Sequence, residues 1–285
     1  MINIRAKSFT HLHLLAIINT ELSRMSKIKT IRILDAGCGD GFLMAYLQEG
    51  IRILRPDINF EIYGFDVSDH GVQPSDFFSN ATKMLSSKFP EISWDNRLFL
   101  LSVNEEWPFS SDFFDIIISN QVLEHVQDSL GFFIKLYKHL KQGGFSVHLF
   151  PLKNYIFEGH LYLPFVHRIL NWDLQFSYIK FLNKMGLGKY RFAKNSGCQL
   201  DEYSLSHADY MVFMTKYLSY SEVLKLGKQA RLRPCFRYTQ ELYFQKARSI
   251  FGLKPVYLYP KDRNAIIDWF SVFALKYVSG ITLFL

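Results

Sequence analysis

The sequence predicts an α/β protein built on a doubly wound, mostly parallel sheet, and three observations carry this prediction. Over the first 150 residues, short apolar stretches alternate with stretches of helical periodicity, as expected when helices cover a parallel sheet. A glycine-rich turn at residues 35–41 (DAGCGDG) separates the first apolar stretch from the first helical one. A second apolar stretch ends on an acid, Asp66, about one strand–helix–strand unit after Asp35.

The element boundaries follow from the periodicity and from the positions of proline and glycine. We expect strands over residues 31–36, 60–66, 97–102, 113–119 and 145–150. We expect helices over residues 8–25, 42–54, 74–88, 127–141, 219–230 and 239–250. The pair Gly143-Gly144 would cap the helix before the fifth strand. From Pro151 to about residue 217 the chain is aromatic and basic and shows no regular pattern.

The glycine-rich turn predicts a ligand site at the end of the first strand. Its glycines, Gly37, Gly39 and Gly41, allow positive φ angles and let a ligand approach the backbone closely. Free N–H groups at the start of the following helix offer donors to an anionic group. Asp66, at the end of the next strand, can accept hydrogen bonds from ribose hydroxyls.

Four segments together resemble the class I S-adenosylmethionine (SAM)-dependent methyltransferases. They are LDAGCGDG (34–41), YGFD (63–66), the run WPF…FDIIISNQVLEHV (107–126) and LKQGGF (140–145). They occur in family order and spacing and cover about half of the chain. The resemblance implies a Rossmann-like sheet, the seven-stranded class I methyltransferase fold. It also implies SAM as cofactor, S-adenosylhomocysteine as product, and no metal. Residues 232–238 and 280–285 would supply its closing antiparallel strands.

The same resemblance implies which residues hold the cofactor. Asp66 would bind the ribose hydroxyls, and Val67 would pack on the adenine. The methionine end would be held by Asp35, Ala36, Gly37, Cys38 and Gly39.

Two further pairs complete the implied cofactor site. Val103 stands where the family often has an acid near the adenine amino group, which leaves that contact to a backbone N–H or to the neighbouring Asn104. Asn120 and Gln121 follow the fourth strand, at the edge where open α/β sheets bind ligands, and would line the site near the transferred methyl group.

A base helps methyl transfer when the acceptor is a hydroxyl, and histidine is the usual base near neutral pH. His125 lies in a Leu-Glu-His-Val stretch similar to one in many small-molecule methyltransferases, where it would either orient other groups or act as the base. His148, His160 and His167 are further candidates, each open to the alternative of a packed or surface histidine.

The resemblance and the change of pattern at Pro151 divide the chain into three parts. Residues 1–150 would form the SAM-binding core, 151–217 an aromatic and basic insert after strand five, and 218–285 the completion of the sheet. The segment EGHLYLPFVH (158–167) resembles bacterial methyltransferases associated with surface-polysaccharide or glycolipid synthesis. The acceptor implied is a hydroxyl of a saccharide or lipid-linked saccharide, with aromatic rings stacking on sugars. Phosphate groups could meet Arg168, Lys180, Lys184, Lys189 and Arg191.

Charge and cysteine usage bear on partners and compartment. Residues 1–150 hold 14 Lys and Arg against 17 Asp and Glu, whereas residues 151–285 hold 19 against 9, so the second part suits an anionic partner or membrane surface. The three cysteines share no short spacing, which predicts neither a disulfide framework nor a zinc site. No secretory leader is evident, and we expect a cytoplasmic protein, with peripheral contact at the inner membrane face as an alternative.

The apolar residues 265–285 approach the length of a membrane span. Asp268 and Lys276 would each be costly at the centre of a bilayer. We therefore expect a packed helix followed by a terminal strand, with peripheral membrane contact as the second interpretation.

Three other functions compete with a small-molecule methyltransferase. A nucleic-acid methyltransferase would explain the basic second part, yet residues 119–122 (SNQV) lack the Asn/Asp-Pro-Pro-Tyr/Phe pattern of amino-methylating DNA enzymes. A dehydrogenase would need G-x-G-x-x-G, but the turn reads G-x-G-x-G. A scaffold that keeps the fold without SAM is a non-enzymatic alternative, which the intact Asp35, Gly37 and Asp66 argue against.

Overall fold

The computed structural model describes residues 8–25, 30–68, 76–260, 264–278 and 280–285. Its centre is a sheet of six strands in the order β3-β2-β1-β4-β5-β6. The first five pair in parallel, and β6 runs antiparallel to β5 at one edge. The strands are β1 Thr30–Ala36, β2 Asn59–Val67, β3 Leu98–Leu101, β4 Phe114–Asn120, β5 Leu140–Pro151 and β6 Gly280–Phe284.

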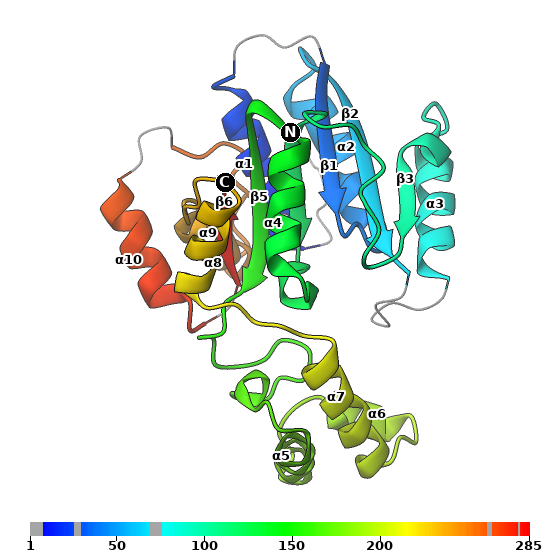
Figure 1. Ribbon diagram of the computed structural model, residues 1–285, viewed down its shortest axis with the longest axis vertical. Helices are drawn as coiled ribbons and strands as arrows, with labels where there is room; N and C mark the ends of the chain where they lie inside the picture. The colour runs from blue at the N-terminus through cyan, green and yellow to red at the C-terminus, as the bar shows by residue number, and fades with distance from the viewer. Residues whose placement is uncertain (1–7, 26–29, 69–75, 261–263, 279) are drawn as a thin grey trace.

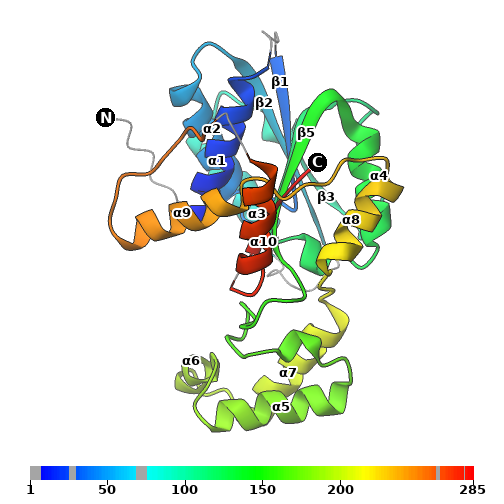
Figure 2. The ribbon, with the colours of Figure 1, turned by 90° about the vertical axis from the view of Figure 1, so that its left-hand side faces the viewer.

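Helices cover both faces of this sheet, as Figures 1 and 2 show. Helices α1 (Phe9–Leu22), α2 (Phe42–Leu54) and α9 (Thr239–Ile250) lie on one face, and α4 (Ser129–His139) and α8 (Tyr220–Gln229) lie on the other. The remaining helices are α3 Phe77–Lys88, α5 Trp172–Lys184, α6 Tyr190–Asn195, α7 Leu200–Phe213 and α10 Ala265–Leu275, with short 3₁₀ turns η1 Trp94–Asn96, η2 Leu123–His125 and η3 Val166–Arg168.

Alternation along the strands divides the core between the two faces. Ile116 and Ile118 of β4 join the cluster that holds α1 and α2, whereas Ile117 between them joins the cluster that holds α4. Successive side chains of a strand point to opposite faces, so an unbroken apolar run is what a strand covered on both sides requires. The α/β prediction is confirmed, and the expected bounds of β1 to β4, α2, α8 and α9 agree within one or two residues.

The predicted strand over residues 232–238 is wrong. Within the described residues this segment makes one bridge, in which Cys235 exchanges backbone hydrogen bonds with Phe284. Pro234 has no N–H to donate, and Arg231 and Tyr238 have positive φ angles of 63° and 73°, so the segment cannot extend the pairing. The described sheet therefore has six strands rather than the seven expected.

The prediction that Gly143 and Gly144 cap α4 is wrong. Both glycines lie inside β5. The helix ends at His139, and β5 begins at the next residue. Pairing shifts between β4 and β5, where Phe114 faces Leu140 but Ile116 already faces Phe145. The glycines lie in the resulting bulge: Gly143 has φ 82°, and a Cβ on Gly144 would lie 2.7 Å from the carbonyl oxygen of Asp115.

The segment between β5 and α8, expected to be irregular, contains the helices α5, α6 and α7. They share their own hydrophobic cluster, which includes Leu161, Ile179 and Met211. The regular pattern is hidden in the sequence because these helices also expose large apolar side chains, among them Leu174 and Phe181. In Figure 1 the three helices lie beyond one end of the sheet.

The expectation of a C-terminal helix followed by a terminal strand is confirmed, although α10 packs through only a small part of its surface. Strand β6 completes the sheet through Ile281 and Leu283, which are fully buried. Helix α10 buries only Val272 completely among its residues. Among the described residues, none of the helices is long and apolar enough to cross a bilayer.

Replacement of Gly144 by alanine should destabilise the fold, because the added Cβ would meet backbone atoms at 2.7 Å that cannot rotate away. We expect Gly144→Ala to lower the free energy of unfolding by about 1–3 kcal/mol in urea titrations. Gly280→Ala, in the neighbouring strand, is the control: its Cβ would find its nearest contact at 3.5 Å, and we expect a change within about 0.5 kcal/mol. Equal losses would rule out the contact as the cause.

Candidate functional site

The predicted cofactor residues gather at the C-terminal ends of β1, β2 and β4. Asp35 pairs with Ile118, so Asn120 lies two residues further along, beside the glycine-rich turn. Asp66 lies one position beyond the pairing of Ala36 with Phe65. In Figure 1 these strand ends point toward the part of the molecule that carries α5, α6 and α7. The site therefore lies at the edge where open parallel sheets bind ligands.

Hydrogen bonds tie the glycine-rich turn to the end of β2. The N–H groups of Gly37 and Cys38 donate to the carbonyl of Phe65 at 2.9 and 3.0 Å. The N–H of Gly39 donates to Oδ2 of Asp66 at 2.6 Å, and the N–H of Val67 donates to Oδ1 of the same carboxylate at 2.8 Å. Asp66 thereby joins the turn to the second strand and fixes the shape of both.

Gly37 is required by packing as well as by its φ of 84°. A Cβ at this position would lie 2.4 Å from Cγ2 of Val122, which precedes η2. The absence of a side chain lets the loop after β4 approach the glycine-rich turn. This contact brings Glu124 and His125, both in η2, toward the cofactor residues.

Asp35 is a buried carboxylate that lacks a protein partner among the described residues. Its exposed fraction is 1%, and neither oxygen accepts a hydrogen bond. Burial first, and then the carboxylates of Asp66 and Asp40, raise its pKa well above the ordinary value. A buried carboxylate is stabilised by a cationic donor, so the α-ammonium group of SAM fits this position. The Oδ1 atom of Asn120 is likewise buried without a partner in the described structure.

The other predicted cofactor residues differ in exposure. Ala36 and Cys38 are buried, and burial raises the pKa of the Cys38 thiol. Val67 is half-buried and pairs with Leu101, which places the exposed Val103 and Asn104 beside the end of β2. Gln121 is exposed, with a φ of 59°, and its backbone N–H donates to the carbonyl of Leu149 at 2.7 Å.

Two of the four histidine candidates lie in the core. His148 is fully buried in β5, and its ring nitrogens are 2.8 Å from Oγ of Ser119 and 3.0 Å from Oγ of Ser146. Burial lowers its pKa to about 3, which does not fit a base. His167 is buried, stacks on Tyr155, and binds the carbonyl of Lys153 at 3.1 Å. The structure gives both of them packing roles.

His160, in the segment 151–217, and His125, in η2, lie together. Their rings are 5.4 Å apart, and both rings contact Tyr210 of α7. Nδ1 of His125 is 3.0 Å from the carbonyl of Met214, so this nitrogen donates and η2 is tied to the end of the insert. The backbone N–H of Lys216 adds a hydrogen bond to the carbonyl of Glu124 at 2.6 Å.

A buried carboxylate orients His160. Oε1 of Glu158 is 2.5 Å from Nδ1 of His160 and accepts a hydrogen bond from the hydroxyl of Tyr217 at 2.9 Å. Its Oε2 accepts from the N–H of Leu161 at 2.7 Å. Burial opposes the charged form, but these hydrogen bonds hold the pKa of Glu158 below its ordinary value. Nε2 of His160 is the ring nitrogen that Glu158 does not engage.

A second buried carboxylate, Glu124, has no such partners. Neither oxygen accepts a hydrogen bond from another residue within the described structure. Burial raises the pKa of Glu124 to about 8, opposed in part by its own backbone N–H and reinforced by the charge of Glu158. Sequence reasoning missed Glu124 and Glu158 as members of the site. The available signals were that each lies within two residues of a candidate histidine, in Leu-Glu-His-Val and Glu-Gly-His. In the part of the chain that the structure describes, no His, Cys, Asp and Glu side chains form a group that could hold a metal ion.

A parallel sheet with the central order β3-β2-β1-β4-β5, a glycine-rich turn after β1 and acids near the ends of β1 and β2 agree with the resemblance to the SAM-dependent methyltransferases described above. The chain matches the family described as "Methyltransferase domain" over residues 10–196, and it belongs to that family.

Individual relatives are more distant. An uncharacterized methyltransferase of Schizosaccharomyces pombe is 29% identical over 121 residues, which cover 41% of this chain and 38% of that protein. Among solved structures, a SAM-dependent methyltransferase from Mesorhizobium loti is similar over 92% of this chain and 94% of its own, with 12% identity and a TM-score of 0.47. Phosphoethanolamine N-methyltransferase 2 of Haemonchus contortus, bound to SAM, is similar over 100% of this chain and 59% of its own, with 13% identity and a TM-score of 0.45.

Removal of either acid should weaken cofactor binding. We expect Asp66→Ala to lower the affinity for S-adenosylhomocysteine at least about tenfold in calorimetric titrations, because a hydrogen bond to a charged group contributes roughly 1.5–3 kcal/mol. Asp35→Asn should have a similar effect, since it removes the buried charge while keeping the shape. Asp57→Ala, an exposed acid at the opposite end of β2, is the control. Unchanged affinity in both site variants would refute this assignment.

Glu124 should make stability depend on pH. Its pKa rises from the ordinary 4.5 in the unfolded chain to about 8, so folding takes up a proton between these values. The wild-type free energy of unfolding should therefore fall as pH rises through this window, by up to about 1.4 kcal/mol per pH unit from this group. The Glu124→Gln variant has no such titrating group. In urea titrations, its free energy of unfolding relative to the wild type should therefore be higher near pH 8 than near pH 5. Equal advantages at both would contradict the assigned pKa.

Proposed function

We propose that this protein is a SAM-dependent methyltransferase that acts on a hydroxyl of a saccharide or lipid-linked saccharide, with His160 as the base. The observation that carries the proposal is the pairing of the buried Glu158 carboxylate with Nδ1 of His160 at 2.5 Å. A hydroxyl is a poor nucleophile until its proton is accepted, so a methyltransferase that acts on hydroxyls benefits from an oriented base. Amine acceptors that are already neutral have less need of one.

SAM, when bound, supplies a methyl group already activated by its sulfonium. Asp35 would hold its ammonium group, the glycine-rich turn would approach its methionine end, and Asp66 would accept from its ribose hydroxyls. What remains for the chain is to align the acceptor, exclude water and receive a proton. The contact of Gly37 with Val122 supports this alignment, because it fixes η2 beside the turn.

Glu158 orients His160, and His160 receives the proton. Nδ1–H donates to Glu158, which leaves Nε2 to accept the proton of the acceptor hydroxyl. The carboxylate then stabilises the imidazolium that forms, as a buried acid does in other histidine-based sites. Tyr217 and the backbone N–H of Leu161 hold the carboxylate in place, so His160 keeps one orientation.

Aromatic rings and cations near His160 suit a phosphorylated sugar. Tyr162 is 59% exposed, and Nζ of Lys189 lies 4.1 Å from the centre of its ring. The same ammonium donates to the carbonyl of Gly159 at 3.0 Å, next to His160. Exposed aromatic faces stack on sugar rings, and a nearby ammonium can meet the phosphate of a lipid-linked saccharide. The excess of Lys and Arg in residues 151–285 also suits nucleic acid, which is the second candidate acceptor.

Replacement of the base should separate chemistry from cofactor binding. We expect His160→Gln to lower kcat for methyl transfer by about 10²–10⁴, with affinity for S-adenosylhomocysteine unchanged. His207→Gln, in α7 of the same insert, is the matched control and should retain activity. The assay follows labelled methyl from SAM into sugars, polyprenyl-linked sugars and RNA. An unchanged kcat would reject the base, and labelling of RNA alone would reject the acceptor class.

A further inference from the structure

Helix α10 exposes a continuous row of apolar side chains, here called the α10 stripe. Its members follow the three- and four-residue spacing that places side chains on one face of a helix. They are Ile266, Trp269, Phe270 and Phe273 of the helix and Tyr277 of the turn that follows it, with exposed fractions from 38% to 65%. Large contiguous apolar surfaces of this kind mark interaction sites in soluble domains.

One flank of α10 is anchored to the fold. Val272 is buried there, and the hydroxyl of Tyr243 in α9 donates to the carbonyls of Leu275 and Gly280 at 3.1 and 3.2 Å. Figure 1 shows α10 at the outer edge of the molecule. The anchoring holds the stripe pointing away from the core, and the stacked rings of Trp269 and Phe273, 5.6 Å apart, stiffen it.

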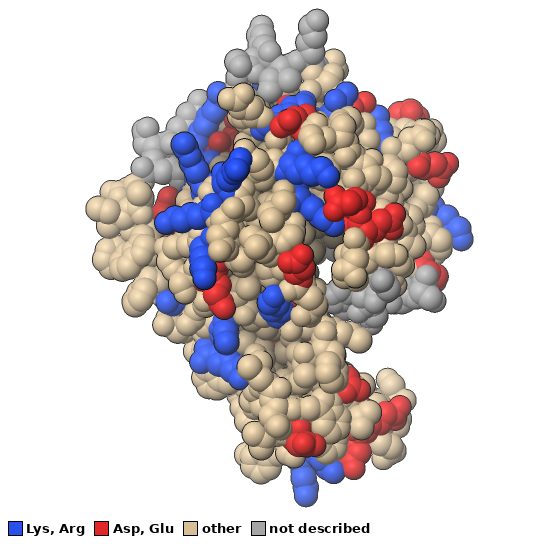
Figure 3. All heavy atoms as spheres, in the orientation of Figure 1, with Lys and Arg blue, Asp and Glu red and all other residues tan. Residues whose placement is uncertain are grey.

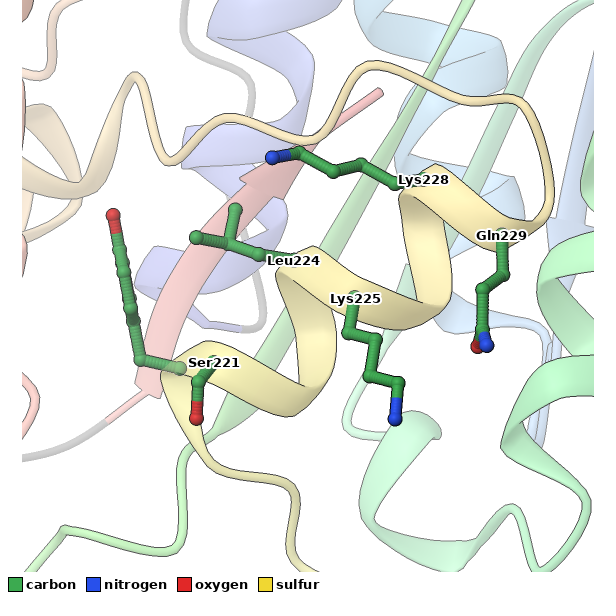
Figure 4. A pocket seen from close by; sticks show the side chains of 6 residues that line it. Ser221, Leu224, Lys225, Lys228 and Gln229 are labelled. Carbon is green, nitrogen blue, oxygen red and sulfur yellow. The ribbon is translucent and has the colours of Figure 1, made fainter.

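Basic side chains flank the stripe on the side of α8. A small cavity lined by Tyr220 of α8 and by Trp269 and Phe273 shows that the two helices adjoin. Next to it, an open groove of about 470 Å³ follows α8, with Lys225 and Lys228 at its rim (Figure 4). The exposed side chains of Arg231 and Arg233 come directly after, and Lys276 lies 4.7 Å from the ring of Phe273. Figure 3 shows Lys and Arg gathered over α8, beside an uncharged outer edge.

We propose that the α10 stripe and the basic α8 face form a docking surface for an anionic lipid bilayer. The stripe would enter the boundary between headgroups and acyl chains, and Lys225 and Lys228 would contact anionic headgroups. At 1.5 Å per residue, α10 is about 16 Å long, roughly half of a hydrocarbon core, so it suits lying in the interface. Tryptophan and tyrosine in the stripe match the residues that favour this depth.

Charge favours a bilayer over a second copy of the chain. A two-fold contact through this surface would bring Lys225, Lys228 and Arg231 of both copies to one interface, where their like charges repel. An anionic surface attracts the same cations. The proposal does not rest on the acceptor class, because it uses neither His160 nor the cofactor residues.

Vesicle binding by the full chain tests the proposal. Vesicles of equal parts phosphatidylglycerol and phosphatidylcholine should sediment the wild-type protein, and vesicles of phosphatidylcholine alone should sediment much less. Trp269→Ser/Phe273→Ser should abolish binding, and Lys225→Gln/Lys228→Gln should weaken it about fivefold for each lysine. Leu174→Ser/Phe181→Ser, which removes similarly exposed apolar side chains from α5, is the matched control and should bind as the wild type does.

Fluorescence and sedimentation velocity complete the test. Anionic vesicles should shift the tryptophan emission to shorter wavelength, and Trp269→Phe should lose this shift while still binding; Trp94 and Trp107 are buried already. Binding that is equal for both lipid compositions, or lost equally in the α5 control, would overturn the proposal. So would a wild-type dimer that the Trp269→Ser/Phe273→Ser variant converts to monomers without any vesicle binding. Retained affinity for S-adenosylhomocysteine shows that each variant is folded.

Discussion

The carboxylate of Asp66 is the constraint on which the cofactor site depends. Its two oxygens bind the N–H groups of Gly39 and Val67, so one side chain holds the glycine-rich turn and the end of β2 in register. The turn needs this support because three glycines within five residues have positive φ angles and little conformational preference of their own. An acid at this position is therefore structural before any ligand arrives, and ligand recognition builds on a preformed geometry.

The second constraint couples the sheet to the insert. Gly37 accepts the close approach of Val122, and the loop that carries Val122 is hydrogen bonded to the end of the insert through His125 and Glu124. Cofactor residues and the candidate base thus belong to one connected set of contacts, although the chain between Gly37 and His160 spans more than a hundred residues. A shift of the insert would move His160 relative to the glycine-rich turn, which makes the packing of α5 and α7 relevant to chemistry.

The sequence predicted the sheet well because both of its faces are covered, and apolar runs such as Ile116–Ile118 have few other interpretations. It failed where local signals were overridden by contacts. Gly143 and Gly144 look like a helix cap but form a bulge against Asp115, and residues 232–238 look extended but pair only once. The cofactor residues around the glycine-rich turn were predicted from a local sequence motif. Glu158 was missed because its importance comes from burial beside His160, which no local pattern reports.

Glu124 and Glu158 show why the cluster suits one proton transfer. Two carboxylates in a buried region cannot both be charged without a large free-energy cost. Their surroundings shift their pKa values in opposite directions. Glu158 has donors from His160, Leu161 and Tyr217, so it keeps the charge, whereas Glu124 lacks partners among the described residues and holds a proton near neutral pH. The cluster thus carries a single negative charge beside His160. That single charge balances the imidazolium that forms when His160 accepts the proton of a hydroxyl. A second negative charge, on Glu124, would have no positive partner and would remain as a buried unpaired anion.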